Sequence, residues 1–170
     1  MKKTVLIYGL IIGTIYITGA LYMTDLLFYK NPDIKSNDFL GYVVMIIIYS
    51  LIFFGVRNYR NHHLNGVISF KKAFKTGVMI TLTASTLYVV IWLFYYYLFV
   101  PDFMDKYTEY VLRHASPSEL DAKTQMMNDF KTMYKNPLFI VLITYVEIFP
   151  VGLIVSLVSA LILKKKRDEA

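Results

Sequence analysis

The chain has 170 residues, of which 56% are hydrophobic and 18% are charged, and its formal charge is +6. Water-soluble domains are typically about 45–50% apolar and about 25% charged, so the composition argues against that class. The absence of cysteine excludes a disulfide framework, a CxxC redox pair and a thiolate zinc site.

The apolar residues are gathered into four long blocks. At about 1.5 Å per residue, a helix of roughly 18 to 26 residues crosses a hydrocarbon core about 30 Å thick. A soluble core helix carries a polar stripe at helical period, and these blocks carry none. We therefore predict an all-α polytopic membrane protein, a single domain with four transmembrane helices over residues 5–28, 39–56, 77–100 and 138–163.

The first block begins with Lys2 and Lys3, as a signal peptide does. Its apolar stretch continues past Ala20, beyond the roughly 7 to 15 residues of an ordinary signal-peptide core. We favour a retained transmembrane helix over a cleaved signal peptide.

The positive charge marks the orientation of the chain. With four spans both termini share one side, and that side carries the larger share of the 18 Lys and Arg residues. The positive-inside rule then predicts a multi-pass protein with both termini in the cytoplasm. Because the basic residues lie at helix ends, we expect no nucleic-acid partner.

A basic segment leads into the third span, where Phe70 and Phe74 lie at helical spacing among lysines. It is either a short interfacial helix or a basic loop flanking the span. In both cases we expect contacts with anionic lipid of the bilayer. The expected contact residues are Lys71, Lys72, Lys75, Lys164, Lys165, Lys166 and Arg167.

Residues 102–135 form the only long connection outside the spans and read as an extracytoplasmic helical hairpin between spans three and four. Phe103, Tyr107 and Tyr110 mark an apolar stripe on its first helix. The second helix is predicted to open with a capping box at Ser116 to Glu119. We expect these stripes to pack on each other, on the membrane surface or on a membrane protein partner.

Small residues mark the helix-packing faces. Gly9 and Gly13 form a GxxxG pair on the first span, and Gly152, Ser156 and Ala160 form a ridge on the fourth. Such residues let backbones approach where no hydrophobic effect draws helices together. They predict packing within the bundle, with a homodimer seam as the alternative.

Tyrosines are frequent near the outer ends of the spans, as at Tyr22, Tyr29 and residues 95–97. We interpret them as an interfacial belt, because tyrosine has an apolar body and a polar tip. A ligand-stacking cage is the alternative.

Glu147 is the most unusual residue in the spans. It lies nine residues into the fourth block, and a carboxylate at the middle of a span costs on the order of 2.5–3.5 kcal/mol on insertion scales. Tyr16, Tyr49 and Tyr88 are the hydroxyl partners expected at that depth. Apolar surroundings without a cation disfavour the charged form, so we expect Glu147 to be largely protonated.

Two hypotheses account for this acid. It is either a structural group that fastens the bundle by hydrogen bonds, or a proton or cation site in a small transporter. The first is favoured, because a transporter of only four spans usually needs a dimer and a second polar helix face.

The sequence nominates no enzyme. It contains no GxSxG, HExxH or phosphate-binding glycine loop, so we expect no catalytic residues and no cofactor. His62 and His63 are predicted on one side of the membrane and His114 on the other, so we expect no metal site.

Two segments carry a family resemblance. Ile68-Ser69-Phe70-Lys71-Lys72-Ala73-Phe74-Lys75-Thr76-Gly77 is the first; Tyr134-Lys135-Asn136-Pro137 together with Glu147-Ile148-Phe149-Pro150-Val151-Gly152 is the second. They resemble the domain-of-unknown-function 4199 family of bacterial four-span membrane proteins. The resemblance implies an integral inner-membrane protein and supplies no catalytic or binding residues.

The leading prediction is a non-enzymatic structural or accessory component that contacts a partner through the hairpin. The alternative is a small proton- or cation-coupled transporter that uses Glu147.

Overall fold

The computed structural model describes residues 1–165 and is all-helical there apart from one isolated bridge, as the sequence predicts. The elements in chain order are α1 (Lys2–Thr24), the π-helical η1 (Asp25–Lys30), α2 (Asp38–Tyr49), α3 (Leu51–His63), α4 (Phe70–Leu98), α5 (Phe103–Arg113), α6 (Leu120–Met133) and α7 (Pro137–Leu163). Four helical stretches are long and apolar enough to cross a membrane, namely Lys2–Lys30, Asp38–His63, Phe70–Leu98 and Pro137–Leu163.

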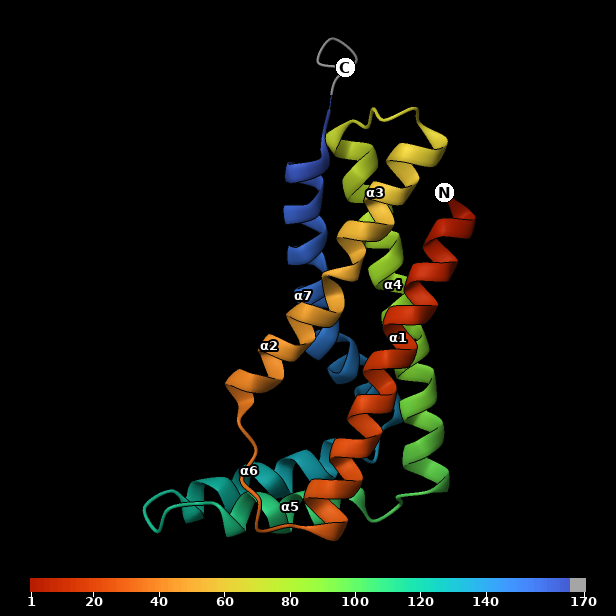
Figure 1. The fold of residues 1–170 in the computed structure, drawn as a ribbon. Helices are drawn as coiled ribbons and strands as arrows, with labels where there is room; N and C mark the ends of the chain where they lie inside the picture. The colour runs from red at the N-terminus through yellow and green to blue at the C-terminus, as the bar shows by residue number, and fades with distance from the viewer. Residues whose placement is uncertain (166–170) are drawn as a thin grey trace.

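The long helices form a bundle with two different ends (Figure 1). The start of α1, the α3–α4 connection and the end of α7 lie together at one end, called here the α3–α4 end. The α5–α6 hairpin lies across the opposite end, called here the hairpin end. The helices are close together towards the α3–α4 end, whereas α2 diverges from α1 and α7 towards the hairpin.

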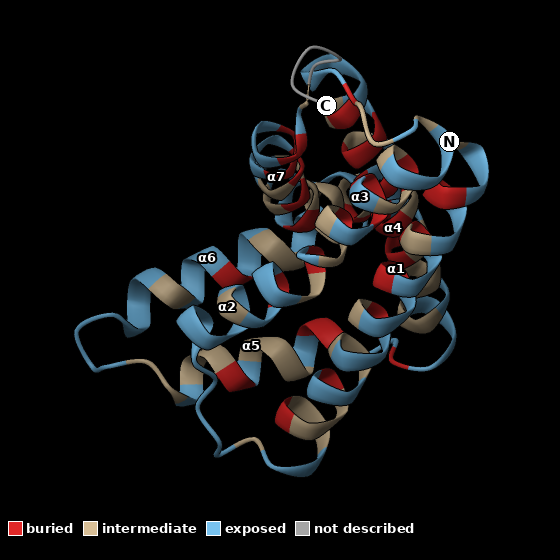
Figure 2. Ribbon diagram, turned by 45° about the horizontal axis from the view of Figure 1, so that its top comes forward, coloured by how far each residue is buried: buried red, intermediate tan, exposed pale blue. Residues whose placement is uncertain are grey.

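Helix α4 occupies the centre of the packing. Its most extensive contacts are with α7 and α1, and buried positions gather along it and along the facing sides of its neighbours (Figure 2). Its buried residues recur at helical spacing and include Ala73, Gly77, Ile80, Ala84 and Tyr88. Many are small, which lets neighbouring backbones approach α4 closely.

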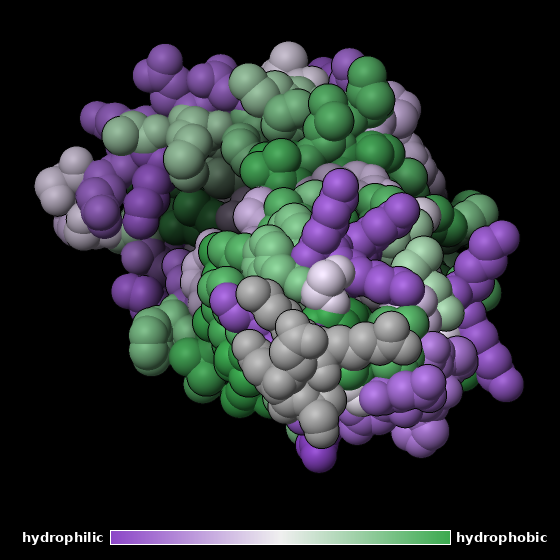
Figure 3. Space-filling model, turned by 90° about the horizontal axis from the view of Figure 1, so that it is seen from above, coloured by the Kyte–Doolittle hydropathy of each residue, from purple (hydrophilic) through white to green (hydrophobic). Residues whose placement is uncertain are grey.

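The outward faces of the long helices are apolar. Leu6, Ile47, Leu142 and Ile154 are all exposed, and hydrophobic side chains cover the flanks when the molecule is seen from the α3–α4 end, with hydrophilic side chains over that end (Figure 3). A contiguous apolar band of this kind is unfavourable in water and suits a hydrocarbon solvent. The fold is that of a multi-pass membrane protein.

The second span is interrupted at Ser50, between α2 and α3. The Ser50 hydroxyl donates a hydrogen bond to the carbonyl oxygen of Ile47 at 2.6 Å, and the Phe53 amide donates to the Ser50 carbonyl at 3.0 Å. Such back-bonding and tightened turns bend helices. The break directs α2 away from the rest of the bundle.

Helix α7 begins with Asn136 as its N-cap: the Asn136 side chain accepts from the Leu138 amide at 3.0 Å and Pro137 takes the first helical position. Pro150 lies inside the helix. Because proline has no N–H to donate to Val146, it accounts for the bend of α7 visible in Figure 1.

The basic segment before the third span is neither a loop nor a separate interfacial helix. It is the first two turns of α4, which Ser69 caps by accepting from the Lys72 amide at 3.4 Å. Ile68, just before this cap, pairs with Lys165 through two backbone hydrogen bonds of 3.2 and 2.9 Å. This bridge ties the α3–α4 connection to the residues that follow α7.

Candidate functional site

Small residues close the bundle near the α3–α4 end. A methyl group on Gly9 would come within 2.6 Å of the Thr83 Cβ, and one on Gly13 within 2.9 Å of the Ala84 carbonyl oxygen. The GxxxG pair of the first span therefore packs against α4 within the same chain.

The fourth span uses its predicted ridge in the same way. Gly152 lies directly against Thr81, and Ser156 lies against Gly77, with 2.8 Å between the Ser156 Cβ and a methyl group placed on that glycine. The Thr81 and Ser156 hydroxyls are 3.1 Å apart and hydrogen-bonded, and Ala160 is fully buried. We call this α4–α7 contact the small-residue seam.

A cavity of about 600 Å³ lies on the hairpin side of this seam. Elements from the whole bundle contribute to it: α1, η1, α2, α4, α5, α6 and α7. We call it the chamber. Its lining includes Tyr16, Thr24, Phe28, Tyr42, Tyr88, Trp92, Phe103, Tyr107, Phe130, Tyr134, Thr144 and Glu147.

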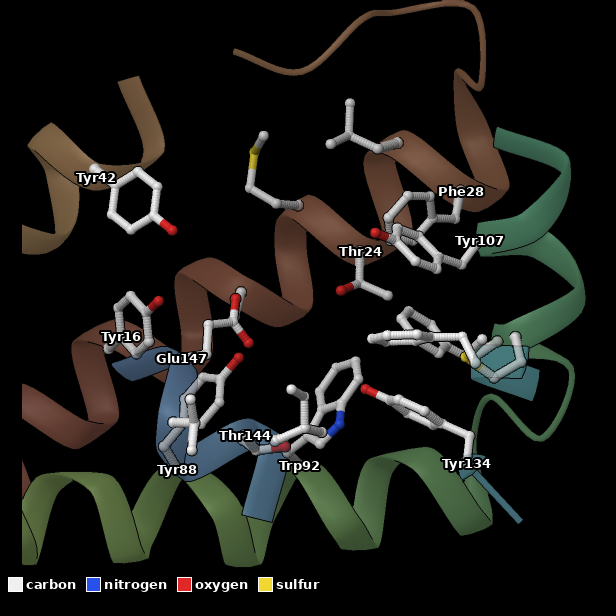
Figure 4. Close-up of a pocket in the computed structure, with 18 residues that line it drawn as sticks. Tyr16, Thr24, Phe28, Tyr42, Tyr88, Trp92, Tyr107, Tyr134, Thr144 and Glu147 are labelled. Carbon is white, nitrogen blue, oxygen red and sulfur yellow. The ribbon is translucent and has the colours of Figure 1, made fainter. Parts of the chain in front are cut away.

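Glu147 is exposed within this chamber rather than packed into the bundle. Figure 4 shows its carboxylate directed into the space between Tyr16, Tyr42 and Tyr88. Among the described residues, no hydrogen bond or ion pair joins Glu147 to another side chain. The carboxylate therefore faces a space that a ligand or a proton can enter.

The three tyrosines expected around Glu147 have different positions. Tyr16 and Tyr88 line the chamber, with ring centroids 4.9 Å apart. Tyr49 is fully buried, lies 3.4 Å from the Ser85 hydroxyl and packs against Gly152 instead. Tyr49, which was also expected as a partner of Glu147, lines neither cavity, since its side chain is directed to Ser85 and Gly152.

A second cavity of about 560 Å³ adjoins the chamber on the α1–α2 side. Both cavities are lined by Tyr16, Ala20, Met23, Tyr42 and Glu147. The remaining lining of the second cavity comes from α1, α2 and the residues just before α2, among them Asp38, Leu40, Met45 and Ile48. We call it the side cavity. It lies between α1 and α2, two helices that diverge towards the hairpin in Figure 1.

The hairpin covers the chamber with its apolar stripes. Phe103 is buried, and its ring makes edge-to-face contacts with Phe28 and Trp92. The ring centroids are 5.6 Å and 5.1 Å apart, respectively. Tyr107, Phe130 and Tyr134 line the chamber from the two hairpin helices. The stripes thus face the bundle of the same chain, an arrangement that was not among the three expected from the sequence.

Polar contacts fasten the hairpin to the connection between the first two spans. Arg113 forms an ion pair of 2.6 Å with Asp33. The Tyr110 hydroxyl accepts from the Ser36 amide at 2.6 Å and donates to the Ile34 carbonyl oxygen at 3.2 Å. These contacts join the hairpin to the segment that leads into α2.

The hydroxyls that the hairpin places in the chamber are neutral. Burial raises the pKa of Tyr107 and of Tyr134, and the negative charge of Glu147 adds to both increases. Hence they offer hydrogen bonds and ring faces to a ligand, but no charge.

The second hairpin helix starts later than predicted. Ser116 donates both its amide and its hydroxyl to the Glu119 carboxylate, at 3.2 and 2.6 Å. Because the Ser116 hydroxyl donates to this side chain, it does not cap a backbone amide, and residues 117–119 form a turn before α6 begins at Leu120.

The basic residues expected at lipid headgroups lie at the α3–α4 end. Lys71, Lys72, Lys75 and Lys164 are exposed, and Lys165 is partly so. Lys166 and Arg167 lie outside the described residues. Within residues 1–165, no group of three or more His, Asp or Glu side chains has a geometry that could hold a metal ion.

Reasoning from the sequence missed Tyr42, Trp92, Tyr107 and Tyr134 as lining residues of one chamber. The signal was present in the aromatic content of 16%, which we assigned to an interfacial belt. Tyr22 fits the belt interpretation, because it is exposed and lines neither cavity.

Comparison with known proteins agrees with the resemblance found in the sequence. No curated protein and no solved structure matches the chain. The family described as "Protein of unknown function (DUF4199)" matches residues 7–165, which include most of the first long helix, all of the other three, the hairpin and Glu147. The chain therefore belongs to the DUF4199 family.

Proposed function

We propose that this protein is a small proton- or cation-coupled transporter in which Glu147 exchanges a proton for a cation. The observation that carries the proposal is the exposure of the Glu147 carboxylate in a chamber, without a hydrogen bond or ion pair to any described side chain. Ionisable residues at this depth typically mark ion or proton pathways. An acid that fastened the bundle would be paired, which is the reason we prefer transport to the structural role.

The proposed setting is the bacterial inner membrane, with the α3–α4 end in the cytoplasm. Support comes from the lysines at that end, which follow the positive-inside pattern and suit anionic headgroups. The hairpin then covers the chamber from the outer side, and the protein acts without catalytic residues or cofactor.

Labelling with a hydrophobic carbodiimide tests whether Glu147 is an accessible, protonatable acid. The reagent modifies protonated carboxyl groups in apolar sites, and mass spectrometry locates the adduct. We expect an adduct on Glu147 that decreases as the pH is raised, and none on Asp129, an exposed acid of α6 that lines neither cavity. Absence of label on Glu147 in folded protein would overturn the proposal.

Proteoliposomes with a trapped pH-sensitive dye test the exchange itself. We expect added cations, supplied as sodium, potassium and tetramethylammonium chlorides in turn, to dissipate an imposed pH gradient through the wild-type protein. The Glu147→Gln variant keeps the volume of the side chain and removes the exchangeable proton. Equal dissipation by both proteins would contradict a role for Glu147.

An accessory role through the hairpin is the second candidate. It is favoured by Met126 and Met133, two exposed apolar side chains seven residues apart on the same face of α6. Crosslinking with mass-spectrometric identification of neighbours, in wild type and in a Met126→Gln, Met133→Gln variant, tests it. A neighbour lost only in the variant supports this role, and an unchanged set of neighbours contradicts it.

A further inference from the structure

The charged residues that line the two cavities are all acidic. Glu147 lines both of them, and Asp38, the first residue of α2, lines the side cavity. The described lining residues include no Lys, Arg or His. An anionic ligand would meet two carboxyl groups and no compensating charge, so the cavities reject anions.

Aromatic side chains lie around the acid. In Figure 4 the Glu147 carboxylate lies near Tyr16, Tyr42 and Tyr88, and the rings of Tyr16 and Tyr88 pack against each other with centroids 4.9 Å apart. Trp92 and Tyr134 line the part of the chamber closer to the hairpin. Cations with an organic surface bind over such rings within about 6 Å of the centroid, most strongly where water is excluded.

The same lining does not suit a bare metal ion. Calcium requires 6–8 oxygen ligands and magnesium a near-ideal octahedron. Here one carboxylate faces tyrosine hydroxyls carried on separate helices, and residues 1–165 contain no cluster of three or more acidic or histidine ligands. The chamber is therefore built for a cation that makes few directional bonds.

The size and the position of the cavities define the rest of the ligand. Pockets of about 300–1,000 Å³ accommodate drug-sized molecules, and the chamber of about 600 Å³ continues into the side cavity of about 560 Å³. Apolar residues such as Leu40, Met45 and Ile48 line the side cavity on the flank of the bundle. A ligand with an apolar body can thus enter from the hydrocarbon between α1 and α2.

From these observations we infer that the joined cavities bind an amphiphilic organic monocation, a substituted ammonium or phosphonium with an apolar body, whose charge lies beside Glu147. Asp38 at the edge of the side cavity attracts the cation at the membrane surface, and the ring faces stabilise it inside. This inference rests on the proposed function and specifies its substrate class.

Tetraphenylphosphonium and tetraphenylborate provide a matched pair of probes, because they share size and shape and differ in the sign of their charge. Trp92 is the single tryptophan of the chain and lines the chamber, so its emission reports occupancy. We expect tetraphenylphosphonium to change the Trp92 emission saturably and to release heat in titration calorimetry. Tetraphenylborate should bind at least about tenfold more weakly, since charge-assisted contacts favour only the cation. Equal binding of both probes would show that the chamber binds them by apolar contact without regard to charge, and it would overturn the inference.

Matched variants separate charge from packing. Glu147→Gln should weaken tetraphenylphosphonium binding about tenfold and abolish its dependence on pH, whereas Asp129→Asn should leave both unchanged. Tyr42→Leu should weaken binding several-fold, whereas Tyr22→Leu, on an exposed tyrosine outside both linings, should not. Size-exclusion profiles identify any variant that does not fold, and the probe pair on the wild-type protein decides the case without variants.

The pH dependence has defined contributors. The titratable groups that line these cavities with Glu147 are Tyr16 from α1, Asp38 and Tyr42 from α2, Tyr88 from α4, Tyr107 from α5 and Tyr134, the residue that follows α6. Asp38 is the other carboxyl group in these linings, so it competes with Glu147 as the source of a change in binding with pH. The pH dependence of tetraphenylphosphonium binding could instead disappear in Asp38→Asn and persist in Glu147→Gln. That result would place the cation beside Asp38 and overturn the assignment to Glu147.

The substrate class and the proposed function fail in different ways. If carbodiimide labels Glu147 and the pH gradient is dissipated while tetraphenylphosphonium does not bind, the transporter proposal stands and the organic-cation inference falls. If tetraphenylphosphonium binds and protects Glu147 from the reagent while no gradient is dissipated, the site is a receptor for organic cations rather than a transporter.

Discussion

The Thr81 hydroxyl on α4 and the Ser156 hydroxyl on α7 are hydrogen-bonded at 3.1 Å, directly beside the two glycines that let these helices meet. Each hydroxyl is also hydrogen-bonded to its own helix: Thr81 donates to the Gly77 carbonyl at 3.1 Å and Ser156 to the Gly152 carbonyl at 2.7 Å. Polar groups are thereby satisfied inside the bundle where no water is present to bond them.

This contact predicts that the seam tolerates no added volume. Gly152→Ala would drive a methyl group into the Thr81 side chain, whereas Gly19→Ala meets nothing within 4 Å. We expect the first change to lower the free energy of unfolding by about 1–3 kcal/mol, and the second to leave it unchanged or slightly raised. Denaturation in one detergent, followed by circular dichroism, measures both. Equal stability of the two variants would contradict the close α4–α7 contact.

The hairpin contacts predict a local effect at Ser36. Tyr110→Phe removes the hydroxyl that accepts from the Ser36 amide, and we expect a loss of about 0.5–1.5 kcal/mol with faster hydrogen exchange at that amide. Tyr107→Phe, three residues earlier on α5, removes a hydroxyl with no hydrogen bond among the described residues. Unchanged exchange at residues 34–38 in Tyr110→Phe would disprove the link between hairpin and connection.

The turn before α6 predicts a pH effect in the acidic range. Hydrogen bonds from Ser116, with Lys123 nearby, lower the pKa of Glu119 below its ordinary value. A carboxyl group with a depressed folded-state pKa stabilises the fold above its unfolded pKa and loses that contribution as the pH falls through the folded pKa. We expect the Ser116 amide to exchange faster below that range. In Ser116→Ala, NMR titration should show the Glu119 pKa returning towards its ordinary value, and no change would refute the assignment.

The lysines of the α3–α4 end predict selective lipid binding. Lys71, Lys72 and Lys75 are exposed and lie in no ion pair of the described chain, so each should contribute about 1 kcal/mol to attraction towards anionic headgroups. Replacing all three by Gln should reduce the phosphatidylglycerol retained in native mass spectrometry, and leave phosphatidylcholine unchanged.

The matched control lies at the other end of the molecule. Lys106, Lys123 and Lys131 are already paired with Glu109, Glu119 and Asp105. Their replacement by Gln should change anionic-lipid retention much less. Equal losses from the two triple variants would show that net charge, rather than position, controls lipid binding.

The sequence predicted the long helices well, because length and continuous apolarity are properties of single segments. The structure places the residues expected at the packing faces in the interior of the bundle: Gly9, Gly13, Gly152, Ser156 and Ala160 are all buried. Small size on one helical face has few other uses inside a membrane.

The chamber was beyond such reasoning, because its lining is assembled from segments far apart in the chain. Tyr42 and Tyr134 are ordinary aromatic residues near helix ends until α2 diverges at Ser50 and the hairpin folds back over the bundle. The break at Ser50 itself has no strong signal, since serine is common within helices of this kind. Tyr49 was expected as a partner of Glu147 only because both residues lie at a similar depth in their spans. Its side chain is on a different face of the helix and is directed to Ser85 instead.

The small-residue seam also determines what the chamber can exchange with. Close contacts of α4 with α1 and α7 fill the bundle towards the lysine-rich end, while the side cavity opens between α1 and α2 near the hairpin. In the proposed transport function, a molecule bound in the chamber would have to pass this seam to reach the lysine-rich end. A transport cycle would then have to part α4 and α7 where Ser156 lies against Gly77.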